Sequence, residues 1–217
     1  SCKKILTNIR LQINYIKMYS YYCSMNYLAH ILLSGTNPDV IIGNFIADSI
    51  KGSKYNSYPV EIQKGILLHR QIDTITDAHP AFRKSTKRLH KNYGHYSGII
   101  VDIFYDHFLA KNWSDYSDIP LDAYIQTFYK LLRDNFDILP ANIQKMAPVM
   151  IEGNWLLIYA ELEGIDRVLA GMNRRTKNRS GMDKAGQELK EFYTLFEADF
   201  KLVMKDLQTL SDNFLVD

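Results

Sequence analysis

The sequence predicts an all-α protein, built as a single-domain bundle of several helices. Three observations favour this fold class. The chain has 217 residues, of which 47% are hydrophobic, enough for one domain with a sizeable core. Helix start and stop residues recur along most of its length. The alternating runs bounded by Asn-Gly or Asp-Gly turns that indicate β-hairpins are missing.

The helices of the first half are defined by their terminal residues. The segment from Asn37 to Gly52 has Asn37 as an N-cap, Pro38 at the first helical position and Gly52 after its end. The next helix is predicted to start near Pro59 and to stop before Pro80, because a proline disfavours helix in the residue before it. Further helices are predicted over 79–94, 96–113 and 120–136.

The second half is predicted to contain shorter helices and one long one. The region 141–172 is expected to be interrupted at Pro148, Gly153 and Gly164, and 173–181 to be a basic linker. Apolar residues alternating four and three apart then indicate a last helix whose seam packs along another helix, which we interpret as core packing. The seam residues are Leu189, Tyr193, Phe196, Phe200, Val203, Leu207 and Leu210.

Residues 1–24 differ in composition from residues 25–217, which we interpret as the helical domain. This leader contains four basic residues, no acidic residue and both cysteines, Cys2 and Cys23. Two cysteines do not support a disulfide framework, so a reduced, cytoplasmic setting is expected. We interpret the leader as an N-terminal extension rather than a secretory signal, with an amphipathic targeting segment as the alternative. No stretch approaches 18 consecutive apolar residues, so no membrane span is expected.

Several classes of function are disfavoured. The formal net charge of +2 is too small to argue for nucleic acid, and no aromatic residues are interleaved with the basic clusters. The chain also lacks a glycine-rich phosphate loop, a dinucleotide-binding fingerprint and the G-x-S-x-G motif of serine hydrolases.

Four predicted helices each carry a pair of polar residues four apart, in otherwise apolar surroundings. The pairs are Asn26 and His30, Asn44 and Asp48, His69 and Asp73, and Asp102 and Asp106. Residues four apart share one face of a helix, and buried charges are usually paired or bound to a metal. We therefore expect the pairs to meet in one polar pocket. Mixed histidine and aspartate ligands suit Mn²⁺, Fe²⁺ or Mg²⁺ better than a structural zinc.

Each pair also has a plainer interpretation. Either histidine could be a hydrogen-bonded core residue, and Asp102 with Asp106 could form a solvated stripe. Asp48 could simply end a helix, although a negative charge near the carboxyl end opposes the helix dipole, which favours a functional role. Asp77, one turn beyond Asp73, is interpreted as structural.

A basic stripe follows these pairs, within a stretch (78–94) that contains no acidic residue. A solvated helix face is the plain interpretation, but a stripe of one sign favours an acidic partner. A second basic cluster lies within 174–179. The stripe consists of Arg83, Lys84, Lys87, Arg88 and Lys91.

At these residues the chain resembles the acyl-carrier-protein phosphodiesterase family. The resemblance starts at Met25, covers almost all of residues 25–210 and leaves the leader outside. The matching pieces are "MNYLAHILLSG" (25–35), "GNFIADSIKG" (43–52), "GILLHRQIDTITDAHP" (65–80), "VDIFYDHFLAKNW" (101–113) and, more weakly, "IDRVLAGMNRR" (165–175).

The resemblance implies a helical, HD-domain-like protein, distantly related to the HD-type metal phosphohydrolases. It implies hydrolysis of the phosphodiester that joins 4′-phosphopantetheine to a serine of acyl carrier protein, with Mn²⁺ as the usual cofactor. The essential aspartate of the family's G-N-x-x-A-D motif falls on Asp48. In place of an adjoining His-Asp dipeptide the chain has His69 and Asp73, and Asp106-His107 has the reverse order.

These residues suggest a hypothesis for metal-assisted hydrolysis. Asp48 would be both ligand and catalytic residue, and Asp73 or Asp102 would accept a proton from the attacking water. Arg70 would bind the phosphate, and His107 would protonate the departing serine oxygen. The acidic carrier protein would dock on the stripe over 83–91. The ligand candidates are Asp48, His69, Asp73 and Asp106, followed by Asp102 and His30.

Two other functions stay open at this point. A metal phosphohydrolase acting on a small phosphoester, such as a nucleotide, would use the same pocket without a docking surface. A helical binding protein could retain the pocket without turnover. The sequence does not indicate an oligomeric state.

Overall fold

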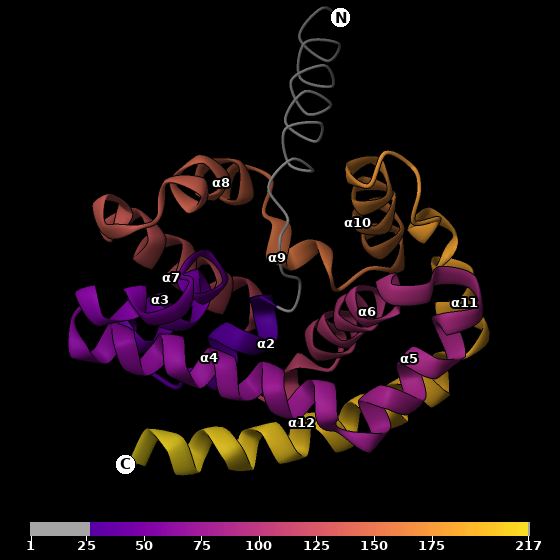
Figure 1. Cartoon of the computed structure of the whole chain (residues 1–217), viewed down its shortest axis with the longest axis horizontal. Coiled ribbons are helices and arrows are strands. Elements are labelled where there is room, and N and C mark those ends of the chain that lie inside the picture. The colour runs from indigo at the N-terminus through magenta and orange to yellow at the C-terminus, as the bar shows by residue number, and fades with distance from the viewer. Residues whose placement is uncertain (1–26, 217) are drawn as a thin grey trace, which may run out of the picture.

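A computed structural model describes residues 27–216 of the chain (Figure 1). This part consists of α-helices joined by turns and short 3₁₀ helices and contains no strand, which confirms the predicted all-α class. Within the same range, no helix combines the length and the apolar character needed to cross a membrane. The predictions for the leader, its two cysteines and Asn26 fall outside the described residues.

The order of the elements agrees with the sequence prediction in most segments. The α-helices are α2 (Tyr27–Leu33), α3 (Pro38–Ile46), α4 (Val60–Ala78), α5 (Pro80–Tyr93), α6 (Ser97–Lys111), α7 (Leu121–Asp134), α8 (Ala141–Glu152), α9 (Trp155–Ile158), α10 (Leu162–Arg175), α11 (Gly186–Glu191) and α12 (Tyr193–Val216). The 3₁₀ helices are η1 (Ala47–Ser49), η2 (Gly52–Ser57), η3 (Gly94–Tyr96), η4 (Trp113–Asp115), η5 (Phe136–Ile138) and η6 (Met182–Lys184).

Helices α4 and α5 follow one another along the length of the molecule, and α12 packs beside both of them (Figure 1). Helices α2, α3, α7 and α8 lie at one end of the molecule in the view, and α6, α10 and α11 lie toward the other. His79 separates α4 from α5, because Pro80 starts a new helix and the His79 side chain accepts a hydrogen bond from its second residue at 3.1 Å. The predicted boundaries of α4 and α5 are confirmed.

Helix α3 is shorter than predicted. Asn37 caps it as expected, its side-chain oxygen accepting from a backbone N–H of the first turn at 3.0 Å. The helix ends at Ile46, so Asp48 lies in the 3₁₀ turn η1 instead of at the end of a long α-helix. The backbone is extended at Ile50, and Gly52 starts η2 rather than following a helix, so the prediction of one continuous helix up to Gly52 is wrong.

Two glycines allow α3 and α4 to lie in direct backbone contact. A Cβ atom at Gly43 would lie 2.1 Å from the carbonyl oxygen of Ile62, and one at Gly65 would lie 2.2 Å from that of Val40. Real Cβ contacts are never this short, so any larger residue would push the helices apart. This contact fixes the side chains that follow Gly43 on α3 against those that follow Gly65 on α4.

Three predictions for the second half need correction. Pro148 lies inside α8, and Gly164 lies inside α10. Gly164 serves close packing instead of ending a helix, because its Cβ would lie 1.9 Å from the carbonyl oxygen of Ile158. Only Gly153 lies directly after a helix, as predicted. The basic linker is also shorter, since α10 continues to Arg175.

The predicted seam of the last helix is confirmed as core, although a break at Phe192 divides it between α11 and α12. Tyr193 and Leu210 are partly buried, and the other seam residues are buried. The seam packs on α6 through ring contacts such as that between Phe196 and Phe104, whose centroids are 5.1 Å apart.

Candidate metal centre

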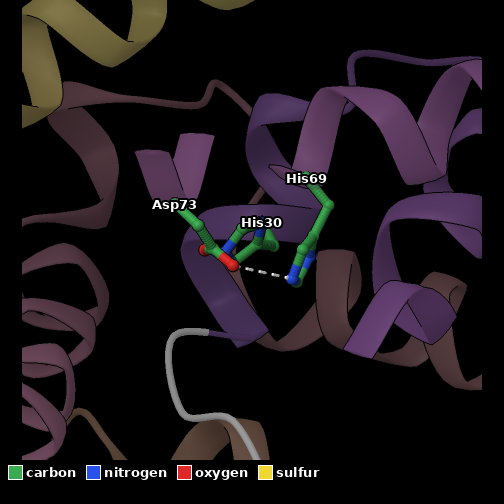
Figure 2. Close-up of side chains that lie close together, drawn as sticks. All are labelled: His30, His69 and Asp73. Carbon is green, nitrogen blue, oxygen red and sulfur yellow. Dashed lines mark ion pairs between the residues drawn. The ribbon is translucent and has the colours of Figure 1, made fainter. Parts of the chain in front are cut away.

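Polar side chains from four elements meet beside the contact between α3 and α4. His30 comes from α2, Asn44 from α3, Asp48 from η1, and His69 and Asp73 from successive turns of α4. Three of the four predicted polar pairs therefore contribute to one place, through their described members. Figure 2 shows His30, His69 and Asp73 with their polar atoms turned toward one another.

Asn44 holds both imidazole rings in one orientation. Its Oδ1 atom lies 2.8 Å from Nδ1 of His30 and 3.0 Å from Nδ1 of His69. Because a carbonyl oxygen only accepts, both Nδ1 atoms carry the hydrogen and donate it to Asn44. The amide is itself held, since its Nδ2 donates to the backbone oxygen of His30 at 3.1 Å. The two rings stack with centroids 4.0 Å apart, and both Nε2 atoms are left for another partner.

Both Nε2 atoms point at carboxylates. His30 Nε2 lies 3.2 Å from Oδ1 of Asp73, and His69 Nε2 lies 3.2 Å from Oδ2 of Asp73 and 3.3 Å from Oδ1 of Asp48. His30 is 2% exposed, and its Nε2 has no hydrogen bond of acceptable geometry. A buried imidazole lone pair facing a carboxylate oxygen is costly unless a proton or a cation lies between them.

The electrostatics of the group indicate one shared proton. Burial, and then the charge of His69, lower the pKa of His30. Burial also acts to lower the pKa of His69, but the carboxylates of Asp48 and Asp73 outweigh it and raise that pKa to about 9. For Asp73, burial acts to raise the pKa, but the two histidines outweigh it and hold the pKa well below its usual range. The directions of these shifts favour a proton on Nε2 of His69 rather than on Nε2 of His30.

A divalent cation fits this arrangement. Nε2 of His30, Nε2 of His69 and a carboxylate oxygen of Asp73 all lie within 4.8 Å of one another. A cation between them would replace the proton of His69 and give the lone pair of His30 a partner. Asp48, beside His69, could supply a further oxygen. Mixed imidazole and carboxylate donors suit Mn²⁺, Fe²⁺ and other divalent metals, and Asn44 has the role of the outer hydrogen-bond partner that orients metal-binding histidines.

The fourth polar pair lies next to this group, but its two members have different surroundings. Asp102 is partly buried, and burial together with the charges of Asp73, Asp106, Asp77 and Asp48 raises its pKa well above the usual range. A crowd of carboxylates that raises the pKa of one of its members is a favourable place for a metal ion, because a cation offsets their mutual repulsion.

The structure does not bring Asp106 into the group. It is fully buried, and its two oxygens accept the backbone N–H groups of Leu28 and Ala29, both at 3.1 Å. Burial raises its pKa to about 8, although the two hydrogen bonds oppose the shift. Asp106 therefore holds the first turn of α2, the helix that carries His30.

Two other predicted site residues make hydrogen bonds outside this group. Nδ1 of His107 donates to the backbone oxygen of Tyr159 and Nε2 accepts from the hydroxyl of Tyr193, both at 2.8 Å, so His107 lies between α6, α9 and α12. Arg70 donates through Nη2 to the backbone oxygens of Ile50 and Gly52, at 3.0 and 2.9 Å. Arg70 thus binds the segment that follows Asp48.

The predicted docking stripe lies on α5 and is only partly available. Arg88 forms an ion pair of 2.5 Å with Asp199, a buried residue of α12, and Lys84 lies 3.6 Å from the same carboxylate. Arg83 donates to the backbone oxygen of Asp77. The remaining members, Lys87 and Lys91, are exposed. The acid that the sequence of α5 lacks is thus supplied by α12.

Asn44 joins the two imidazoles, although spacing alone predicts it only as the polar partner of Asp48. The sequence signal for such a role is the place of Asn44 in the G-N-F-I-A-D motif, directly after Gly43.

A separate cavity of about 370 Å³ lies between α7 and α8, and none of the predicted site residues lines it.

Comparisons with known proteins agree with the resemblance. A model of the family "Acyl carrier protein phosphodiesterase" matches residues 25–207. A protein of that name from Photorhabdus laumondii subsp. laumondii is 31% identical over 81% of this chain and 89% of its own length. Those from Klebsiella pneumoniae subsp. pneumoniae and Yersinia pestis are 30% identical over 87% of this chain and 98% of their own, and 34% identical over 70% and 80%, respectively. No solved structure matches the chain significantly. The chain therefore belongs to the acyl carrier protein phosphodiesterase family.

Proposed function

We propose that this protein hydrolyses the phosphodiester between 4′-phosphopantetheine and the serine of acyl carrier protein, with the help of a divalent metal ion. The names of its relatives support the reaction and the substrate. The observation that carries the metal dependence is the convergence of His30 Nε2 and His69 Nε2 on Asp73, while Asn44 engages both Nδ1 atoms. That arrangement aims two Nε2 atoms and a carboxylate at one point.

The proposed ligands are His30, His69 and Asp73, with Asp48 as the fourth. Mn²⁺ is our first choice, with Mg²⁺ or Fe²⁺ as alternatives, because a mixed nitrogen and oxygen donor set accepts all three. Such an ion, when bound, lowers the pKa of a coordinated water and polarises the phosphoryl oxygens. Asn44 keeps both imidazoles oriented so that their Nε2 atoms face the ion.

Asp102 is our candidate for the residue that accepts the proton of the attacking water. It lies among Asp48, Asp73 and Asp77, close enough for their charges to raise its pKa. A carboxyl group with raised proton affinity suits general acid–base catalysis near neutral pH. We leave His107 out of the mechanism, because its two ring nitrogens are both hydrogen-bonded at another interface. Asp106 is likewise assigned to the support of α2 rather than to the metal.

The test is incubation of metal-stripped protein with holo acyl carrier protein, with and without Mn²⁺, followed by mass spectrometry. Loss of the phosphopantetheine arm only in the presence of metal is expected. His69→Ala and Asp73→Asn should abolish the loss and also the rise in melting temperature on adding Mn²⁺. Asp212→Asn, an exposed position on α12, is the control and should retain both. Full turnover by Asp73→Asn would remove this residue from the mechanism.

The same assay separates the two alternative functions. Hydrolysis of nucleotides at rates that match the carrier protein would favour a small-substrate phosphohydrolase. Metal binding without turnover of either substrate would favour a binding protein.

A cytoplasmic location belongs to the same proposal, because it depends on the low cysteine content and on the proposed substrate.

A further inference from the structure

The proposed reaction restricts where the substrate can dock. The phosphorus atom under attack is joined through one oxygen to a serine on the surface of a folded protein. That surface must therefore come right up to the metal centre, and docking residues must lie on the elements that surround it. The rim is itself acidic, with Asp48, Asp73, Asp77 and Asp102, and would repel an acidic partner unless cations lie close by.

The segment 49–58, between Asp48 and α4, supplies such cations. It contains Lys51 and Lys54 and no acidic residue. Both lysines are exposed, and no ion pair is recorded for either within the part of the chain that the structure describes. Lys51 is only three residues from Asp48 in the chain, and its side chain is exposed.

This segment is held firmly against the helix that carries the metal ligands. Arg70, next to His69, donates to the backbone oxygens on both sides of Lys51 and lies over the ring of Tyr55, 5.1 Å from its centroid. Gln63, one turn into α4, donates to the backbone oxygen of Tyr58 at 2.7 Å. The two lysines are therefore presented on a backbone whose position is fixed relative to His69, which reduces the entropy lost on binding.

We infer that the segment 49–58, through Lys51 and Lys54, is the surface on which the acidic carrier protein docks, with Arg70 as the positioning residue of that surface. The inference rests on the proposed function for the identity of the partner. The stripe on α5 fits less well, because Asp199 already neutralises part of its charge. A phosphate-binding role for Arg70 is replaced by this positioning role.

The experiment compares three double charge reversals with the full-length wild type. Lys51→Glu/Lys54→Glu tests the proposed surface, and Lys87→Glu/Lys91→Glu tests α5. The matched control is Lys177→Glu/Arg179→Glu, at two exposed positions in the loop after α10. Figure 1 shows α10 and this loop at the opposite end of the molecule from α3. All three change the net charge by the same amount, so only the location differs.

Two quantities are measured at low and at high salt: the Kd for apo carrier protein and the KM for holo carrier protein. For Lys51→Glu/Lys54→Glu we expect both to rise about tenfold at low salt, with kcat within about twofold of wild type and a weaker salt dependence. Reversal of acidic residues on the carrier protein should restore binding. The control should stay within about twofold. Circular dichroism checks that each variant folds, because substitutions at exposed positions should not disturb folding.

Unchanged Kd and KM in Lys51→Glu/Lys54→Glu, or an equal change in the control or on α5, would overturn the inference. The Kd measurement distinguishes failure of the docking inference from failure of the proposed hydrolysis. If wild type binds the carrier protein through Lys51 and Lys54 but does not cleave it, docking stands and hydrolysis fails. If wild type cleaves it while binding ignores both lysines, docking alone fails. Absence of binding by wild type would overturn the docking surface as well.

Discussion

Replacement of Asn44 by alanine should damage both the stability of the protein and its affinity for metal. Asn44 is fully buried and makes three side-chain hydrogen bonds, two accepted from imidazole N–H groups and one donated to the backbone of α2. At about 1 kcal/mol for each hydrogen bond, the free energy of unfolding should fall by about 3 kcal/mol. Since the imidazoles lose their fixed orientation, Mn²⁺ affinity should fall 10- to 100-fold, as is typical when an outer partner of a metal ligand is removed.

A second buried asparagine provides a matched control. Asn173, near the end of α10, accepts from the hydroxyl of Ser180 at 2.9 Å and from a backbone N–H at 3.0 Å, and donates to Asp183 of η6 at 2.7 Å. Asn173→Ala should thus lower stability by a similar amount, about 3 kcal/mol, without affecting the metal. Urea denaturation in EDTA gives the stability, and calorimetric titration with Mn²⁺ gives the affinity.

Two results would refute this reasoning. Equal losses of metal affinity in Asn44→Ala and Asn173→Ala would show that the effect is general loosening. A loss of less than about 1 kcal/mol in Asn44→Ala, with normal affinity, would show that the imidazoles are oriented by something else. If Asn44→Ala does not fold, Asn44→Asp keeps the two accepting positions and should retain more of the metal affinity than of the stability.

Three further predictions concern the surroundings of the site. Gly65→Ala should lower the free energy of unfolding by about 1–3 kcal/mol in urea titrations, because the added methyl group meets the backbone of α3; Gly98→Ala, with no atom within 4 Å, should not. In EDTA, the stability that His69 gains from its carboxylate partners should be fully present below pH 6.5 and lost as the pH rises through about 9, and Asp73→Asn should reduce this loss. His107→Leu should cost about 2 kcal/mol in thermal or urea unfolding, by removing two hydrogen bonds, but the cleavage rate per folded molecule should not change. Loss of turnover in folded His107→Leu would restore a catalytic role to that residue.

The fold class and most helix boundaries could be predicted because they depend on local signals. Asn37, Pro80 and Gly94 act within one turn of their own positions, and the structure has helix ends at all three. The break after Ile46 had no such signal, since the polar and apolar spacing runs on through Asp48. The course of the chain there is set by contacts from other elements, such as the hydrogen bonds of Arg70 to the backbone on both sides of Lys51.

The site was predictable in the same measure. Spacing by four identified candidate histidines and aspartates, and members of three of the pairs meet in the part of the chain that the structure describes. Spacing did not distinguish Asp102 from Asp106, because the difference lies in what each faces. Asp106 faces the open end of α2, where backbone N–H groups need an acceptor, and Asp102 faces the other carboxylates. The partners of Asp106 lie 78 and 77 residues away in the chain, beyond the reach of any local pattern.

The G-N-F-I-A-D motif gains a physical explanation from these contacts. Its glycine allows α3 to touch the backbone of α4, and its asparagine, the next residue, then reaches both imidazoles. Four residues further on, after the helix has ended, the aspartate lies beside the Nε2 atom of His69. Each residue type depends on the one before it: without the close approach the amide would not reach His69, and without the amide the Nε2 atoms would not converge. The motif is therefore better understood as one structural unit that builds the candidate metal centre than as a set of independent residues.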